Sequence, residues 1–290
     1  MSPFSIEDLI EQYIKEKRFL ANLSEHTIRS YRLALKWFVR LGGDFNKIAL
    51  SNFVIGLKES GMNAGGCNVK IRSVNSFLTW CFENDCNPEN HRIKKMRGEQ
   101  VIIKTFSDAH VRSLANHQPK DEYQWRMHAI CSLLIDSGAR IDEILSMRLT
   151  SVNLEQLHIN IRGKGGKERF VPISIEMRKV LHVYLSRKKI KCPGDLLFPT
   201  KHGTKVGYHN FLRDFKMHCH ELGIKDVRTS PHGLRHYFAQ NYLIMGGDLY
   251  RLARILGHAN IATTQIYLRS MGIESIREAH QQFSPLSQKR

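Results

Sequence analysis

The sequence predicts a mainly α-helical protein of two domains, with one small antiparallel β-sheet in the second domain. The chain has 290 residues, of which 42% are hydrophobic, enough for one large core or two smaller ones. Apolar residues recur at helical spacing along most of the chain, and one short stretch alternates around a glycine-rich turn. A polar, basic stretch without periodicity lies between the two expected domains. We therefore expect domains over 1–90 and 105–290, joined by a linker over 91–104.

The first domain is expected to be a bundle of four helices. We expect them after Ser5, from Ser24 to the glycine pair at 42–43, over 51–61 and over 64–84. Serine side chains are suited to cap helix N-termini, and an Asn-Pro-Glu-Asn turn ends the fourth helix. Each helix has an apolar stripe, so the four stripes predict a common core.

The second domain is expected to place a hairpin between helices. The stretch from Trp125 to Ser137 is apolar over much of its length, which predicts a buried helix that ends at the following glycine. Two β-patterns, 157–161 and 168–173, flank a Gly-Lys-Gly-Gly turn and predict an antiparallel hairpin. The other expected helices are one that begins at Ser107, a short one over 140–147, and five over 175–189, 208–222, 232–245, 248–256 and 260–270.

Charge is the first indication of function. The chain has 44 Lys and Arg against 27 Asp and Glu, a net charge of +17, and residues 101–290 carry +13 of it. A domain this basic typically binds a polyanion, most commonly nucleic acid. The alternatives are a solvated basic surface or a lipid surface, and the lipid surface is weaker because no helix has a dedicated Lys/Arg face.

The cysteines and the termini indicate a reducing compartment. The six cysteines form no C-x-x-C pair, which favours neither a zinc site nor disulfides, and Cys131 is expected to be a buried thiol. His218-Cys219-His220 resembles a metal cluster, but adjacent helical residues point in different directions, so we interpret it as a helix surface. No apolar run approaches the roughly 20 residues of a membrane span, and the N-terminus is acidic rather than signal-like. We expect a cytoplasmic protein that binds neither membrane nor metal.

Two basic residues lie where a phosphate could bind. Arg140 begins a helix, beside the positive end of its dipole, with Glu143 three residues on. An ordinary Arg–Glu pair is the simpler explanation of that residue alone. Lys164 lies in the hairpin turn, whose spacing is not that of a P-loop. It predicts a mobile ammonium group or simply a solvated lysine.

Imidazoles and an arginine gather at a later helix start. His232, Arg235 and His236 stand at i, i+3 and i+4, so they share one face. Such a face would be costly to bury unpaired, and it predicts an anion site with proton donors. His258 ends the next helix, and Tyr267 lies nine residues further on.

Together these residues resemble the catalytic set of the tyrosine recombinase (phage integrase) family, and the similarity covers nearly the whole chain. The family pattern is Arg, Lys, His-x-x-Arg, His or Trp, then Tyr, with an acidic residue three after the first Arg. Ser24-Glu-His-Thr27 with Tyr31 resembles the start of a family core-binding helix, and the tail from Thr263 to Phe283 resembles the Xer branch. The matching residues are Arg140, Glu143, Lys164, His232, Arg235, His258 and Tyr267.

The resemblance implies an enzyme that cuts DNA without ATP, metal or another cofactor. Tyr267 would attack the scissile phosphate, leaving a 3′-phosphotyrosine and a free 5′-hydroxyl. Arg140 and Arg235 would hold the non-bridging oxygens, Lys164 would protonate the 5′ oxygen, and His232 would help to deprotonate the tyrosine. The rest of the implied catalytic and supporting set is His258, Glu143 and His236.

The resemblance also implies how the enzyme meets DNA. A core-binding (SAM-like) domain and a catalytic domain would clamp a double-stranded site with inverted repeats. Four protomers, identical or from two paralogues, would bind two sites and exchange strands through a Holliday junction, with a translocase or directionality factor as an accessory. A final helix over 273–283 would dock on the neighbouring protomer or fold back on its own domain. Residues expected to contact DNA are Arg92, Lys94, Lys95, Arg97, Lys167 and Arg169.

Three other functions remain open from the sequence. A type IB topoisomerase uses a similar constellation, but the small helical first domain and the Xer-like tail argue against it. A DNA-binding regulator without activity would be expected to have a broken catalytic set. An RNA-binding module is weaker still, because the sequence lacks an aromatic strand motif. The choice between chromosome dimer resolution and movement of a mobile element stays open.

Overall fold

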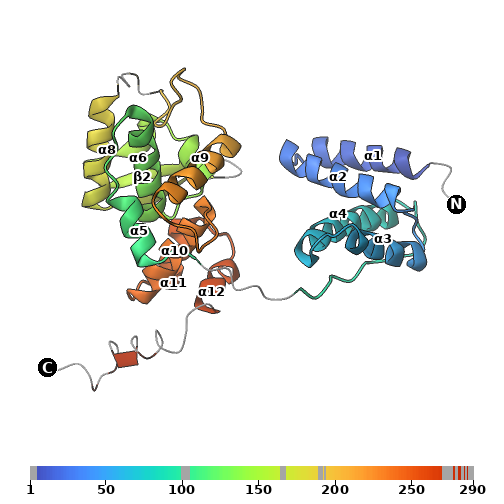
Figure 1. Cartoon of the computed structure of the whole chain (residues 1–290). Coiled ribbons are helices and arrows are strands. Elements are labelled where there is room, and N and C mark those ends of the chain that lie inside the picture. The colour runs from blue at the N-terminus through green and yellow to red at the C-terminus, as the bar shows by residue number, and fades with distance from the viewer. Residues whose placement is uncertain are drawn as a thin grey trace. The chain divides into compact units, whose positions relative to one another are not determined.

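The computed structural model divides the chain into two compact units, Met1–Val101 and Ile102–Arg290 (Figure 1). It describes residues 5–98, 105–163, 168–188, 192, 194–269 and five single positions of the tail: 277, 280, 281, 284 and 286. The division falls within the stretch expected to be a linker.

The N-terminal unit is a bundle of four helices. They are α1 (Ile6–Phe19), α2 (Glu25–Arg40), α3 (Lys47–Glu59) and α4 (Ala64–Glu83). A polar residue caps each N-terminus through its side chain, and the core is rich in aromatic rings. Tyr13, Phe38, Phe53 and Phe77 are fully buried there. Edge-on ring pairs such as Phe38–Phe53, with centroids 5.3 Å apart, add to the stability of the apolar packing.

The start of α3 differs from the prediction. The helix begins at Lys47, because the Asn46 side chain accepts a hydrogen bond from the backbone of Ala49 at 2.8 Å. Ser51, the expected start, instead lies within the first turns and donates to the Lys47 carbonyl at 3.0 Å. Asparagine and serine are both good caps, and the sequence pattern did not distinguish between them.

Residues 91–98 pack on the N-terminal unit. The Asn75 side chain bonds to both the backbone N–H and the carbonyl of Ile93, each at 2.9 Å. Asn68 holds Met96 in the same way, at 2.8 and 2.9 Å. This part of the expected linker is therefore fixed along α4.

The C-terminal unit combines eight helices among its described residues with a three-stranded antiparallel sheet. The observed order confirms a mainly α fold with one small sheet. The strands β1 (Val152–Asn153), β2 (His158–Arg162) and β3 (Glu168–Pro172) lie in the order β1-β2-β3, with Ile159 opposite Val171. The helices are α5 (Asp108–Ala115), α6 (Glu122–Ser137), α7 (Ile141–Leu145), α8 (Ile175–Arg187), α9 (Tyr208–Glu221), α10 (Pro231–Ile244), α11 (Leu249–Leu256) and α12 (Ala262–Arg269).

The core of this unit surrounds α6. Leu133 and Leu134 are fully buried, and Cys131 is confirmed as a buried thiol whose pKa burial raises. α6 begins at Glu122, three residues before the expected position, because Asp121 caps it through the backbone of Gln124. A two-residue strand such as β1 is too short to show alternation, and the prediction missed it.

The interpretation of His218-Cys219-His220 as a helix surface is correct for His220, which is exposed, but wrong for the other two residues. His218 and Cys219 were expected on a helix surface, but only 6% and 0% of these residues is exposed. The His218 ring lies 4.7 Å from that of His117, and His128 is also buried nearby. No group of three or more His, Cys, Asp or Glu within the described ranges is arranged to hold a metal ion.

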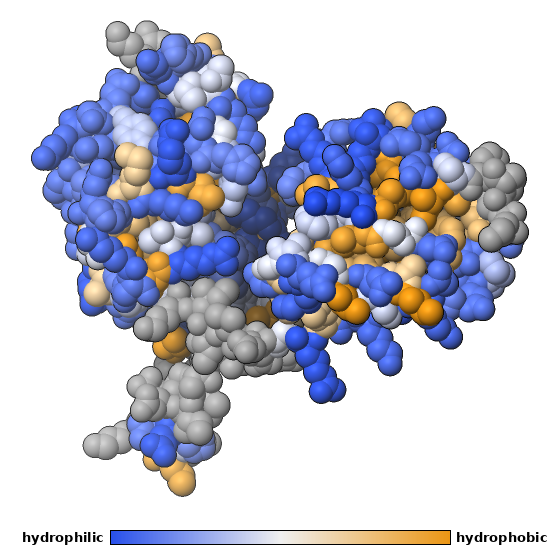
Figure 2. Space-filling model, turned by 45° about the vertical axis from the view of Figure 1, so that its right-hand side comes forward, coloured by the Kyte–Doolittle hydropathy of each residue, from blue (hydrophilic) through white to orange (hydrophobic). Residues whose placement is uncertain are grey.

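The surface is largely hydrophilic in the view of Figure 2, with an apolar area on the N-terminal unit. Exposed apolar residues of that unit include Phe19, Leu20, Ile48 and Ile55. Within the described part of the chain, the structure contains no helix with the length and apolar character needed to cross a membrane.

Candidate active site

A tight turn between α6 and α7 places Arg140. α6 ends at Gly138, whose φ of 60° lies in the left-handed region that glycine adopts without strain. A Cβ at this position would lie 2.3 Å from Cδ1 of Phe238, so the turn also requires glycine for space. Arg140 then becomes the N-cap residue of α7, and 47% of its side chain is exposed. Its guanidinium is therefore accessible at a helix N-terminus, where an anion is favoured.

Arg235 extends from α10 to the turn at Gly138 and is 2% exposed. Its Nη1 donates to the Gly138 carbonyl at 2.7 Å, and its Nη2 donates to the Leu256 carbonyl at 2.8 Å. Burial, and then Arg140, lower the pKa of this guanidinium to about 10, so it stays charged at neutral pH. In the described structure its partners are neutral groups, which leaves a buried positive charge suited to bind an anion.

The tautomer of His258 follows from its two partners. Its Nε2 lies 2.9 Å from Nη2 of Arg235, and its Nδ1 lies 2.9 Å from the hydroxyl of Thr264. A guanidinium only donates, so Nε2 must be the acceptor and Nδ1 must carry the proton. His258 is therefore neutral in this arrangement, and its Nδ1–H donates to Thr264.

Tyr267 is 5% exposed and packs against α10 and α11 with Ala239, Leu252 and Leu256. Its ring is edge-on to that of His236, with centroids 5.3 Å apart, and parallel to that of His258 at 6.5 Å. The His236 ring is in turn 4.4 Å from that of His232. Tyr267 thus lies beside two imidazoles, and the nearer of these is His236.

Glu143 organises the cations at the base of the site. Its Oε2 accepts from the backbone N–H of Arg140 at 2.8 Å, and its Oε1 accepts from Nη1 of the same residue at 3.1 Å. Both carboxylate oxygens also accept from Arg169, at 2.9 and 2.8 Å. Burial alone would raise the pKa of this carboxyl group, but the hydrogen bonds from Arg169 and Arg140 and their charges lower it below its usual value.

Burial and, to a smaller extent, the neighbouring groups lower the pKa values of the three imidazoles. Burial, followed by Arg235, lowers the pKa of His258 to about 4, and burial, followed by His232, lowers the pKa of His236 to about 4. Burial and then Arg235 lower the pKa of His232 as well. A bound phosphate would oppose the effect of the cations and raise all three pKa values.

The structure brings most of the expected catalytic residues into one site. Lys164 and Lys167 lie outside the described residues, as does most of the expected final helix at 273–283. Sequence reasoning recognised Gly138 only as a helix end and did not single out Thr264 or Gly257, because all three act in the site through tertiary contacts. The residues that meet in the site are Arg140, Glu143, His232, Arg235, His236, His258 and Tyr267.

Arg169 has a different environment from the one expected for a DNA contact. Its side chain is 14% exposed, and its guanidinium is taken up by Glu143 and by the carbonyl of Ile255 at 2.9 Å. The sequence showed a basic residue beside the hairpin, but it could not show this partner 26 positions earlier in the chain.

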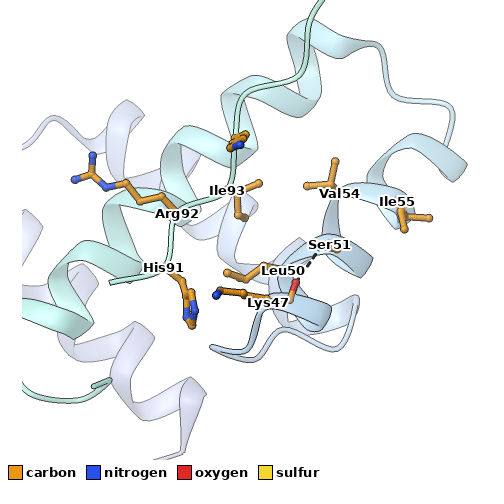
Figure 3. A pocket seen from close by; sticks show the side chains of 9 residues that line it. Lys47, Leu50, Ser51, Val54, Ile55, His91, Arg92 and Ile93 are labelled. Carbon is orange, nitrogen blue, oxygen red and sulfur yellow. Dashed lines mark hydrogen bonds between the residues drawn. The ribbon is translucent and has the colours of Figure 1, made fainter. Parts of the chain in front are cut away.

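The basic residues of the 91–97 segment lie on the N-terminal unit. Ile93 points inward and helps to line a pocket of about 560 Å³ beside α3, whereas Arg92 is directed away from α3 (Figure 3). In this segment Ile93 is buried and Met96 is half-buried, whereas the basic residues around them are exposed. The exposed basic residues are Arg92, Lys94, Lys95 and Arg97.

A mainly helical fold and a site of two arginines, three histidines and a buried tyrosine are typical of enzymes that cleave DNA through a phosphotyrosine. The sequence matches the Phage integrase family over residues 104–272, more than half of the chain. The chain belongs to this family, and it is a site-specific recombinase of the Xer type of tyrosine recombinases.

The similarity to individual relatives extends over most of this chain and most of each relative. The chain is 28% identical to tyrosine recombinase XerD of Yersinia pestis, over 96% of this chain and 97% of that protein. It is 30% identical to tyrosine recombinase XerA of Pyrococcus furiosus, over 86% and 85%. The solved structure of the Tn1549 transposon integrase with circular intermediate DNA has a TM-score of 0.77 at 17% identity, covering 95% of this chain and 99% of that one. XerH on a palindromic difH substrate has a TM-score of 0.70 at 17% identity, covering 96% and 84%.

Proposed function

We propose that Tyr267 is the nucleophile of this recombinase and that the buried Arg235 charge, beside it, binds the scissile phosphate. The observation that carries the proposal is the convergence of Tyr267, two imidazoles and Arg235 at one place formed by α10, α11 and α12. Arg140 completes an arginine pair that would hold the non-bridging oxygens and stabilise the added negative charge of the transition state.

The chemical step forms one bond and breaks one. The Tyr267 oxygen attacks phosphorus, its proton passes to a base, and the bond from phosphorus to the 5′ oxygen breaks. Lys164 would supply the proton to that leaving oxygen. A neutral imidazole beside the phenol would accept its proton as the bond to phosphorus forms. Because the phosphotyrosine retains the energy of the broken phosphodiester, rejoining needs no cofactor.

The contacts of each histidine suit it to a different part of the reaction, either proton transfer or phosphate binding. His236 contacts the tyrosine ring directly and is neutral, so it is the imidazole best placed to accept the phenol proton. His232 contacts His236 and would assist proton transfer from the phosphate side. His258 shares Nη2 of Arg235 and would take part in phosphate binding.

The partner of this site is double-stranded DNA with inverted repeats. Two observations support this proposal: XerH occupies a palindromic substrate, and a lambda integrase dimer occupies a core site. A palindromic site presents equal half-sites to two protomers related by a two-fold axis. Two such sites would join four protomers, identical or of two paralogues, and exchange strands through a Holliday junction in the cytoplasm. An accessory translocase or directionality factor would act on this assembly, and the 91–97 segment and Lys167 would contact phosphates.

The test is covalent trapping on the protein's own genomic DNA. Purified protein is incubated with nicked genomic fragments and denatured, and the DNA that remains attached is recovered and sequenced. Tyr267→Phe is the control, because it keeps the ring contacts with His236 and His258 but has no nucleophilic oxygen. We expect adducts with the wild type at one inverted-repeat site and none with Tyr267→Phe, although this variant should bind the same DNA.

Other outcomes would favour a different nucleophile or a different function. Adducts that persist in Tyr267→Phe would show that another residue is the nucleophile. Scattered Tyr267-dependent adducts would favour a topoisomerase-like activity, and binding without adducts would favour a regulator that does not cut.

A further inference from the structure

Arg169 binds two parts of the candidate active site. It lies on β3, the strand that follows residues 164–167 in the chain. Its two terminal nitrogens donate to the two oxygens of Glu143 at 2.9 and 2.8 Å, and its Nε donates to the carbonyl of Ile255 at 2.9 Å. Both side chains of the ion pair are mostly buried, with 14% and 10% exposed. A bidentate pair of this kind fixes direction as well as distance.

Each of these contacts leads to a residue of the site. Glu143 also holds the backbone and the guanidinium of Arg140, so Arg169 and Arg140 share one carboxylate. Ile255 is the penultimate residue of α11, three positions before His258. Arg169 and Arg235 therefore bind consecutive carbonyls at the C-terminus of this helix, those of Ile255 and Leu256.

Gly257 allows this close approach. Its φ of 67° lies in the left-handed region, and an added Cβ would be 2.9 Å from Cζ of Arg169. The Arg169 side chain thus packs directly under the turn that presents His258.

We propose that Arg169 is a positioning residue that joins strand β3, the Arg140–Glu143 pair and the turn of His258 into one rigid frame. The inference rests on the proposed function, because it assigns Arg169 to the same phosphotyrosine reaction. Arg169 itself touches neither the phosphate nor the tyrosine in this role. It keeps the phosphate-binding groups Arg140 and His258 in register with each other, where a displacement of about 1 Å can cost about a hundredfold in rate.

The alternative is that Arg169 binds a DNA phosphate. Three of its five N–H donors are already used by Glu143 and Ile255, and the side chain is mostly buried. The two roles make different predictions. Loss of a phosphate contact weakens DNA binding and lowers its salt dependence by about one unit of slope, whereas loss of a positioning residue changes neither.

The experiment compares binding with cleavage in matched variants of the full chain. Arg169→Gln removes the charge, and Arg169→Lys keeps the charge but cannot span both Glu143 oxygens and the Ile255 carbonyl. Glu143→Gln and the double variant Arg169→Gln/Glu143→Gln test the shared carboxylate. Arg178→Gln, an exposed arginine on α8, is the control for loss of one positive charge. The probe is the DNA fragment recovered by Tyr267-dependent trapping, with affinity measured at several salt concentrations and adduct formation measured in a single turnover.

We expect Arg169→Gln to slow adduct formation about a hundredfold, with affinity and salt slope within about twofold of the wild type. Arg169→Lys should be faster than Arg169→Gln but slower than the wild type. The double variant should be hardly slower than Arg169→Gln alone, because both changes disrupt the same Arg169–Glu143 ion pair. Arg178→Gln should leave the rate unchanged.

Two results would overturn the inference. The first is a wild-type rate in Arg169→Gln, and the second is a loss of affinity with a lower salt slope, which would make Arg169 a phosphate contact. If the wild type itself forms no adduct, the proposed function fails, and this inference fails with it. If Arg169→Gln does not fold, a rate for folded Arg169→Lys equal to that of the wild type overturns it as well.

Discussion

Replacing Gly138 by alanine should damage both the stability of the C-terminal unit and the active site. An alanine with φ near 60° carries a strain of about 1–2 kcal/mol. Its Cβ would also lie 2.3 Å from Cδ1 and 2.9 Å from Cε1 of Phe238, an overlap that forces the ring to move. Overpacking of this kind costs about 1–3 kcal/mol, so Gly138→Ala should lose roughly 2–5 kcal/mol of unfolding free energy.

Gly223→Ala is the matched control. Gly223 follows α9 with a φ of 76°, and no atom lies within 4 Å of its added Cβ. This variant should show the strain alone, about 1–2 kcal/mol. The difference between the two variants therefore isolates the contact with Phe238.

Urea unfolding followed by tryptophan fluorescence measures both variants. Trp125 is the only tryptophan of the C-terminal unit, so a Trp37→Phe/Trp80→Phe background reports on that unit alone. Because the Gly138 carbonyl also binds Arg235, Gly138→Ala should slow adduct formation, whereas Gly223→Ala should not. Equal losses of stability in the two variants would refute the steric argument, and an unchanged rate in Gly138→Ala would refute the link to Arg235.

Two further predictions concern protonation. Burial, followed by His117, lowers the pKa of both His128 and His218, so the unfolded chain binds protons first as the pH falls. The stability of the C-terminal unit should therefore decline below a pH of about 6.5, and His232, His236 and His258, whose pKa values are also lowered, should contribute to this decline. His218→Gln should remove only the share of His218 and make the decline shallower in urea unfolding at several pH values; an equal decline in the variant would contradict the assignment. Lys164→Ala should slow cleavage of a normal strand, and a substrate with a sulfur in place of the 5′ oxygen should restore the rate, because sulfur leaves without protonation. Failure of that substrate to restore the rate would count against Lys164 as the acid.

The fold could be predicted because its determinants are local. Caps such as Ser5, Ser24 and Ser107 lie within three residues of the N–H groups that they bind, and the apolar stripes are read from neighbouring turns. The errors were local as well: Asn46 and Asp121 cap their helices a few residues before the expected starts.

The members of the site could be predicted from their order along the chain, but their contacts could not. Arg235 binds a carbonyl 97 positions away, and Arg169 binds one 86 positions away. The periodicity of a sequence carries no information on contacts between residues so far apart in the chain. For this reason the sequence could not show that Glu143 binds Arg169 or that the His236 ring lies against that of Tyr267.

The arrangement also couples phosphate binding to the basicity of the histidines. In the described structure Arg235 hydrogen-bonds to two carbonyls and to the His258 imidazole. Burial, and then the positive charge of Arg235, lower the pKa of His258 and make it a weak base. A phosphate bound between Arg140 and Arg235 would compensate part of this charge and remove the contribution of Arg235 to the lowered pKa of His236, whereas burial, the largest cause, would remain. The imidazole beside Tyr267 would therefore be a better proton acceptor in the DNA-bound enzyme than in the free enzyme.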